Sequence, residues 1–219
     1  MFHVRKFRPR RRTSRYTRRR AVGGAWQVLL YRVIPHVSGV QPGLPGHALH
    51  VSPRQGDGRF DNPAHYRITY FALEASGAVG ESFGDVPDWT RQMFSPECTP
   101  GSVSALVTYR LADRVRLLEL DSAPNLAERG LRPSQVIERN RSASQTWALR
   151  IYGERNQRGD RLWDGVRWWS YHRPAWRIVG YWGEEPPAVL KIEPLDLDHP
   201  AVVDAAFELG RAVGAARAG

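Results

Sequence analysis

Three side chains that could act on a charged substrate stand at regular intervals in one stretch of this sequence. Arg59 follows a turn with two glycines, Tyr70 lies in the apolar run that comes next, and Glu81 follows on a segment of small residues. An arginine can bind an anion through paired hydrogen bonds, and a carboxylate can stabilise a cation that develops during a reaction. The set therefore suits the binding of an anionic nucleotide and the stabilisation of a developing cation.

Three more polar residues extend this set. Tyr31 and Arg32 lie inside an apolar run over residues 26–34, and Asn62 comes shortly after Arg59. Taken singly, each charged residue has a plainer interpretation: Arg32 as an edge or surface arginine, Arg59 as a solvated turn residue and Glu81 as a surface carboxylate. The chemical hypothesis requires the guanidinium of Arg32 and the carboxylate of Glu81 to converge on one electropositive cleft.

Ser142 opens a segment with helical spacing, three residues before Gln145. This is the pattern of a capping box, in which the serine and glutamine side chains satisfy free backbone N–H groups at a helix start. A helix N-terminus also favours anions, because its free N–H groups and its dipole both attract negative charge. The two roles are compatible, and together with nearby arginines they predict a phosphate pocket.

The elements that must position these residues are mostly strands. Helices are predicted over residues 75–83 and 124–130, from 141 to about 156, and from a start at 198–200; strands are predicted over 26–34, 47–52, 67–73, 103–110, 115–121, 165–169, 176–182 and 188–192. No internal repeat is found. The sequence therefore predicts a single α+β domain, with central β-sheets and flanking helices, over residues 23–219.

The net charge of +10 is concentrated at one end of the chain. Ten of the 32 basic residues lie within residues 1–20, which leaves 22 basic against 22 acidic residues in the rest. A block of like charge stays extended, so residues 1–22 are predicted to be a disordered basic tail. Such a tail either contacts nucleic acid without sequence preference or is a leader without function.

Other features of the sequence exclude several classes of protein. A single cysteine, Cys98, excludes an intramolecular disulfide, and no apolar run is long enough to span a bilayer or to act as a secretory signal, so a cytoplasmic location without membrane contact is expected. The seven histidines lack paired metal-ligand spacing apart from His47 and His50, which are taken as solvated loop residues, so no metal site is expected. No glycine-rich dinucleotide fingerprint follows a strand, which argues against a Rossmann dehydrogenase.

Taken in order, these motifs resemble the RES-domain family, bacterial toxins named for arginine, glutamate and serine motifs. The similarity covers roughly residues 26–210 and rests on Tyr31-Arg32, Gly58-Arg59-Phe60 with Pro63 close behind, Tyr70 with Glu81, Ser142 with Gln145, Asp164-Gly165-Val166 leading to Ser170, and Leu190-Lys191-Ile192. Two departures concern the arginine motif, which is one residue longer than the shortest family versions, and the bulky Trp168-Trp169 pair.

The resemblance implies a fold similar to that of ADP-ribosyltransferases and a toxin that depletes NAD by cleaving its nicotinamide–ribose bond. NAD is then a substrate and no cofactor is needed, while the acceptor is either water or inorganic phosphate. In this interpretation Glu81, Arg32 and Tyr70 are catalytic, and Arg59, Ser142, Tyr31 and Asn62 bind substrate. The implied partner is a cognate Xre-type antitoxin.

Two alternative functions stay open at this point. The first is transfer of ADP-ribose to a protein target. The second is a non-enzymatic nucleic-acid-binding protein that uses the basic tail, with five of the eight tryptophans, between Trp163 and Trp182, as a stacking surface. Aromatics on adjacent strands more often form core and cross-strand pairs.

Overall fold

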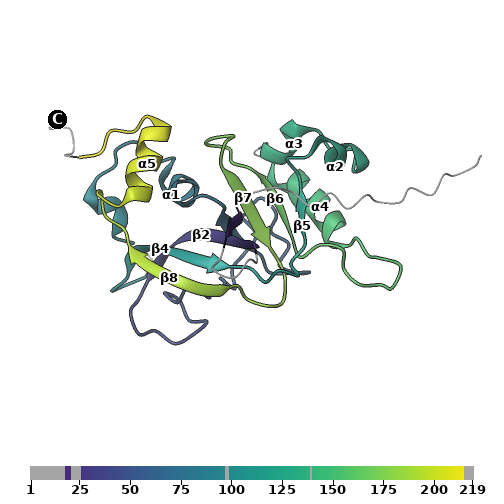
Figure 1. Cartoon of the computed structure of the whole chain (residues 1–219), viewed down its shortest axis with the longest axis horizontal. Coiled ribbons are helices and arrows are strands. Elements are labelled where there is room, and N and C mark those ends of the chain that lie inside the picture. Colours follow the sequence, from purple (N-terminus) through teal and green to yellow (C-terminus); the bar gives the residue numbers. More distant parts are fainter. Residues whose placement is uncertain (1–17, 21–25, 97–98, 139, 215–219) are drawn as a thin grey trace, which may run out of the picture.

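The computed structural model describes residues 18–20, 26–96, 99–138 and 140–214 (Figure 1). The strands are β1 (Arg18–Arg20), β2 (Trp26–His36), β3 (Thr69–Ala72), β4 (Val103–Arg110), β5 (Leu117–Glu119), β6 (Gly165–Trp169), β7 (Arg177–Tyr181) and β8 (Ala188–Pro194). The helices are α1 (Ala75–Phe83), α2 (Ala123–Glu128), α3 (Pro133–Ile137), α4 (Arg141–Tyr152) and α5 (Pro200–Leu209), with a 3₁₀ turn, η1, over Arg91–Phe94.

The strands form one mixed sheet in the order β5-β6-β7-β3-β2-β4-β8, and β1 pairs with the start of β2. The β5–β6 pair is parallel, and the other described pairs are antiparallel. Strand β3 joins the two halves of the sheet, because it pairs with β7 along its length and with β2 through Ala72 and Tyr31. It therefore carries Tyr70 to the middle of the sheet.

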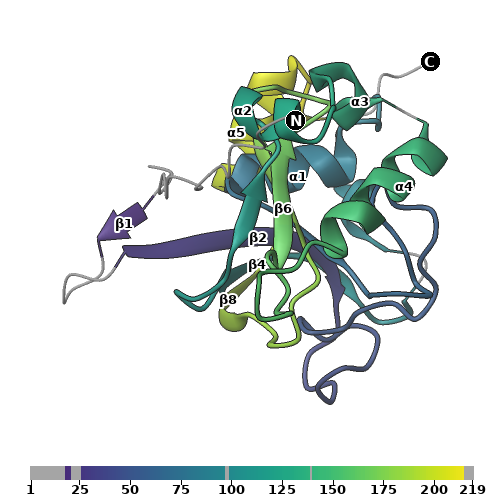
Figure 2. The same cartoon turned by 90° about the vertical axis from the view of Figure 1, so that its right-hand side faces the viewer.

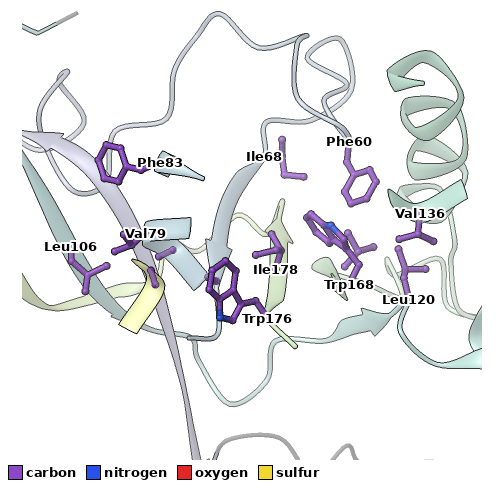
Figure 3. Close-up of a cluster of buried hydrophobic side chains, with 14 of the residues drawn as sticks. Phe60, Ile68, Val79, Phe83, Leu106, Leu120, Val136, Trp168, Trp176 and Ile178 are labelled. Carbon is purple, nitrogen blue, oxygen red and sulfur yellow. The ribbon is translucent and has the colours of Figure 1, made fainter. Parts of the chain in front are cut away.

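The helices lie in two groups. Figure 1 shows α1 and α5 together above β2 and β4, and α2, α3 and α4 beside β5 and β6. Figure 2, turned by 90°, also shows α1 and α5 above β2 and β4. A large apolar cluster fills the space under both groups, and Figure 3 shows its members Phe60, Val79, Val136, Trp168 and Trp176 among others. Of the five tryptophans between Trp163 and Trp182, three are nearly fully buried, and Trp163 and Trp169 are partly buried against the same cluster, which accounts for them as core residues.

The opposite face of the sheet has a second apolar cluster around Leu30, Ile34, Phe71 and Tyr109. Ala48 from the long loop after β2 also belongs to this cluster. Because side chains alternate along a strand, neighbouring residues of β2 and β3 point to opposite faces. The face on which α1 packs is called the α1 face below, and the other the loop face.

The structure confirms the α+β class and most predicted elements, and it corrects several details. Residues 47–52 form no strand, since the loop satisfies its backbone locally: the imidazole of His47 accepts from the N–H of Leu49, and the N–H of Val37 donates to the carbonyl of Gly46. Helix α4 ends at Tyr152, four residues before the predicted end. Helix α3 and the η1 turn were not predicted.

The predicted basic tail, residues 1–22, is described only at Arg18–Arg20. These three residues form β1, which pairs with the start of β2. The rest of the predicted tail lies outside the described residues, as does Cys98. Within the described residues, no helix is both long and apolar enough to cross a membrane.

Candidate active site

A hollow of about 360 Å³ opens on the α1 face of the sheet, where α1, β2, β3 and the start of α4 meet. Its volume lies within the range of small-molecule sites, which are usually about 300–1,000 Å³. Five residues singled out in the sequence line it, together with groups from distant segments: Tyr31, Arg32, Arg59, Tyr70, Glu81, Ser82, Arg141, Trp168, Tyr171 and Ile178.

Glu81 stands on the last turn of α1 with its side chain exposed to solvent at this hollow. The hydroxyl of Ser170, which is fully buried, donates a hydrogen bond to Oε1 of Glu81. That hydroxyl oxygen accepts from the backbone N–H groups of His172, at 3.0 Å, and Arg173, at 3.3 Å. With its acceptor sites occupied, the hydroxyl proton is directed at the carboxylate, which fixes one oxygen of Glu81 and leaves the other for a ligand.

Arg59 brings positive charge to the same hollow. Its Nη1 donates to the carbonyls of Val136, at 3.2 Å, and Glu138 at the end of α3, while Nη2 and Nε donate to no group among the described residues. Burial lowers the pKa of Arg59, with Arg141 acting in the same direction and Glu81 opposing it. Arg59 is therefore a held cation with donors available for an anion.

The turn that carries Arg59 is built around the carboxylate of Asp61, which is buried. Its Oδ2 accepts from the N–H groups of Gly56 and Gly58, both at 2.8 Å, and its Oδ1 accepts from the hydroxyl of Tyr70 at 2.7 Å. A Cβ at Gly58 would lie 2.3 Å from Asp61 Oδ1 and 2.7 Å from the Tyr70 hydroxyl, so only glycine fits there. The turn thus ties the Arg59 backbone to strand β3.

Helix α4 fastens the turn from the other side. The hydroxyl of Ser144 donates to the carbonyl of Arg59 at 2.6 Å, and Nε2 of Gln145 donates to the carbonyls of Gly56 and Gly58. Asn62 completes the link, since its Nδ2 donates to the carbonyl of Gln145 at 3.0 Å. These bonds hold the turn in one conformation, so the amide side chains of Gln145 and Asn62 position Arg59.

Aromatic rings form the remaining wall. Tyr31 and Trp168 line the hollow beside Tyr70, whose ring meets that of Trp168 edge-on at a centroid distance of 6.2 Å. The hydroxyl of Tyr70 is already occupied, because it donates to Asp61 and accepts from the N–H of Phe60 at 3.0 Å. Burial raises the pKa of Tyr70, and Asp61 raises it further, so the hydroxyl stays protonated. Tyr70 therefore offers its ring to a ligand.

The structure does not bring the guanidinium of Arg32 to this group. Arg32 lies in the strand between two hollows, and its Nη1 donates to the carbonyl of His50 on the loop face, at a long 3.5 Å. Tyr31, the residue before it, faces α1. Consecutive residues of a strand point to opposite faces, so the ring of Tyr31 lies on the α1 face, while Arg32, which borders both hollows, directs its guanidinium to the loop face. The positive charge beside Glu81 comes from Arg59 and Arg141.

Ser142 is exposed on the first turn of α4, outside the lining of the hollow. The predicted capping box is wrong: the cap of α4 is Asn140, whose side-chain oxygen accepts from the N–H of Ala143 at 3.1 Å, and Gln145 is committed to the arginine turn. The residue that faces the hollow from this helix start is Arg141.

A larger hollow, about 790 Å³, lies on another part of the surface and is lined largely by charged residues. Its arginines meet acids at its own rim, as in the pairs Arg114–Glu185 and Arg116–Asp164. Exposed pairs of this kind are usually a solvated surface. We place the candidate site in the smaller hollow, where a carboxylate held by a buried group faces a held cation and aromatic rings.

Within the described residues, no group of three or more histidine, cysteine, aspartate or glutamate side chains is arranged to hold a metal ion. The residues of the hollow are suited to bind an organic anion and to stabilise positive charge near Glu81.

Ser170, Asp61 and Arg141 belong to this arrangement although the sequence analysis gave them no role in a site; Ser170 entered it only as part of the family resemblance. Asp61 carried a readable signal, because an aspartate three residues after a glycine in a turn often accepts backbone N–H bonds. Ser170 directly follows a strand end, but nothing in its own segment indicates that it meets Glu81, 89 positions earlier. At the start of α4, the sequence analysis selected Ser142 and passed over its neighbour Arg141.

Comparisons with known proteins bear on this arrangement. A family model described as RES domain matches residues 29–204. Among solved structures, the fold is similar to a chain in the crystal structure of the M. tuberculosis MbcT–MbcA toxin–antitoxin complex, with 15% sequence identity, a TM-score of 0.48, and coverage of 78% of this chain and 85% of that chain. A search of curated proteins found no match.

Proposed function

Since this chain belongs to the RES-domain family, we propose that it is the toxin of a toxin–antitoxin pair and destroys NAD by breaking the bond between nicotinamide and ribose. One observation carries the proposal: the carboxylate of Glu81, held by buried Ser170, shares a hollow with the cation Arg59 and with aromatic side chains. That is the combination of groups needed to hold a dinucleotide and to stabilise the cation that forms when nicotinamide leaves.

The reaction needs little proton transfer. The bond between the ribose C1″ and the pyridinium nitrogen breaks, and its electron pair goes to the nitrogen, so nicotinamide departs neutral. No acid is required to protonate the leaving group, in contrast to glycoside hydrolysis, which uses two carboxylates. A single carboxylate, Glu81, therefore suffices to stabilise the oxocarbenium-like ribose or to hold its hydroxyls.

The remaining residues have separate tasks in this mechanism. Arg59 and Arg141 bind the diphosphate, for which a guanidinium offers paired hydrogen bonds that lysine lacks. The rings of Tyr31, Tyr70 and Trp168 pack against nicotinamide or the ribose face. The acceptor then adds to C1″: water gives ADP-ribose and releases a proton, and phosphate gives ADP-ribose 1″-phosphate.

We further propose that a cognate antitoxin covers this hollow. Glu81 is exposed, and Phe207 and Val203 on nearby α5 are also exposed. An active site that lies open on the surface can be blocked by a partner without a change in the fold. We also propose that this antitoxin is of the Xre type.

The test is incubation of purified, folded and partner-free protein with NAD, in buffers with and without phosphate. We expect release of nicotinamide, with the mass of the second product identifying water or phosphate as the acceptor. No turnover in either buffer contradicts the proposal. Label from NAD on a protein target, in place of a soluble product, identifies ADP-ribosyl transfer. Nucleic-acid binding is tested by a gel shift with and without residues 1–20.

A further inference from the structure

The turn between β6 and β7 carries an aromatic residue to which the mechanism above gives no task. Of the phenylalanine, tyrosine and tryptophan side chains that the structure describes, only Tyr171, at 51%, and Phe207, at 87%, are exposed. Phe207 stands on α5, outside the lining of the proposed active site, whereas Tyr171 lines that hollow. Tyr171 is therefore the exposed ring that a substrate in the hollow can meet.

The backbone on both sides of Tyr171 is fixed. The N–H of Ser170 donates to the carbonyl of Trp176 at 2.9 Å, and the N–H of Trp176 donates to the carbonyl of Arg173 at 3.0 Å. The hydroxyl oxygen of Ser170 accepts from the N–H groups of His172 and Arg173, and the ring of Tyr171 meets that of His172 edge-on at a centroid distance of 5.7 Å. The turn thus holds Tyr171 in place while its ring faces solvent.

The same turn brings Tyr171 close to Glu81. The hydroxyl of Ser170 donates to Oε1 of Glu81, and the Cα atom of the next residue along the chain is about 3.8 Å from that of Ser170. Glu81 and Tyr171 are both exposed, and both line the hollow. A substrate atom that Glu81 stabilises therefore lies near the ring of Tyr171.

The charges of the hollow determine which part of NAD lies at this end. Of the described residues that line it, Glu81 is the one acid, and Arg32, Arg59 and Arg141 are the bases. NAD has a positive pyridinium at one end and a negative diphosphate in its middle. The diphosphate suits the guanidinium groups, and the pyridinium suits the end at which Glu81 and Tyr171 stand, because opposite charges attract.

We propose that Tyr171 determines the specificity of the site for oxidised NAD by recognising the positive charge of the nicotinamide ring. This inference rests on the proposed cleavage of NAD. The face of a tyrosine ring attracts a cation through its quadrupole. The pyridinium would lie between the inner rings, such as those of Tyr70 and Trp168, and the ring of Tyr171 on the solvent side. The uncharged ring of NADH gains less from Tyr171.

This attraction favours the bound substrate over the transition state. As the bond from C1″ to the ring nitrogen breaks, its electron pair moves to the nitrogen and positive charge passes to the ribose. The contact with Tyr171 then weakens, while that with Glu81 strengthens. An interaction that is not stronger in the transition state lowers KM without raising kcat. Tyr171 should therefore act on KM, and Glu81 on kcat.

The experiment measures kcat and KM for NAD, and the Ki of NADH as an inhibitor, in the full-length protein and in Tyr171→Leu. Leucine keeps an apolar side chain and removes the ring. We expect KM for NAD to rise about fivefold, while kcat and the Ki of NADH stay within about twofold. Tyr171→Phe keeps the ring, so its KM should stay within about twofold. The control, Phe207→Leu, removes the other exposed ring and should change none of these constants.

Several results overturn this inference and leave the proposed function intact. They are an unchanged KM in Tyr171→Leu, a fall in kcat without a rise in KM, an equal rise in KM and in the Ki of NADH, and a Tyr171→Phe variant as impaired as Tyr171→Leu. A large fall in the Tm of Tyr171→Leu also overturns it, since an exposed ring without a structural role should leave Tm unchanged. Absence of NAD cleavage by the unsubstituted protein overturns the proposed function, and this inference with it.

Discussion

Tyr31 and Arg32 are neighbours in the chain, yet they serve opposite faces of one sheet. On the α1 face the cation, Arg59, arrives on a turn, is held by two carbonyls and faces the carboxylate of Glu81. On the loop face Arg32 is fixed by its strand and meets no carboxylate among the described residues. The difference shows that the two groups of the α1 hollow, Arg59 and Glu81, are each held in place by other side chains, whereas Arg32 is not.

That second layer is the more informative half of the comparison. Asp61, Ser144 and Gln145 hold the arginine turn, and Ser170 holds Glu81. None of these bonds involves the loop face. The α1 face is therefore pre-organised before a substrate binds, as catalysis by electrostatic stabilisation requires.

The largest expected effect is that of Glu81→Gln. Glutamine can still accept the hydrogen bond from Ser170, so the fold and the shape of the hollow should persist while the negative charge is lost. We expect nicotinamide release from NAD to fall by at least about 1,000-fold, with an unchanged Tm. Retained activity would remove Glu81 from the mechanism.

Arg59→Lys should follow, with a loss of about 100-fold in kcat/KM for NAD. A guanidinium can donate from Nη1 to the α3 carbonyls and from Nη2 and Nε to a diphosphate, whereas an ammonium has its three donors on one nitrogen and cannot bind the diphosphate through a planar pair. The matched control is Arg110→Lys, an exposed arginine at the end of β4, for which the rate should not change. Equal effects of the two substitutions would show that Arg59 contributes only general charge.

Asp61→Asn tests the turn that aims Arg59. The substitution leaves the N–H groups of Gly56 and Gly58 with a weaker acceptor, and we expect a loss of about 1–3 kcal/mol in the free energy of unfolding. Denaturant unfolding measures it. Asp57→Asn, in the same turn but exposed, is the control and should change stability by less than about 0.5 kcal/mol.

Ser170→Ala should have the smallest effect of the four, about tenfold on kcat, because one hydrogen bond to a charged group is lost. As a positioning residue for Glu81, Ser170 should affect kcat and leave KM for NAD unchanged. Ser142→Ala, which removes an exposed hydroxyl, should alter kcat less. A larger loss of kcat for Ser142→Ala than for Ser170→Ala would indicate that Ser142, at the start of α4, is the serine that serves the active site.

Much of this arrangement could be predicted from local patterns. The spacing of Arg59, Tyr70 and Glu81 placed them on a turn, a strand and a short helix, and the structure puts those elements around one hollow. One expectation could also have been corrected from the sequence. Tyr31 and Arg32 are adjacent in a predicted strand, so their side chains point to opposite faces of the sheet.

The rest depended on contacts between distant segments. Ser170 meets Glu81 only because β6 and α1 fold onto the same core. Gln145 was predicted to be a capping residue because its tertiary partners, the carbonyls of Gly56 and Gly58, lie 89 and 87 positions away in the sequence. Local propensity cannot show such partners, since a side chain that would cap its own helix does so only if nothing better lies within reach.

The measurement that tests the account most directly is a crystal structure of the Glu81→Gln variant with NAD. We expect the nicotinamide ribose beside residue 81, the diphosphate on Arg59 and Arg141, and the nicotinamide among Tyr31, Tyr70 and Trp168. A dinucleotide bound on the loop face at Arg32, with the α1 hollow empty under saturating NAD, would contradict the account.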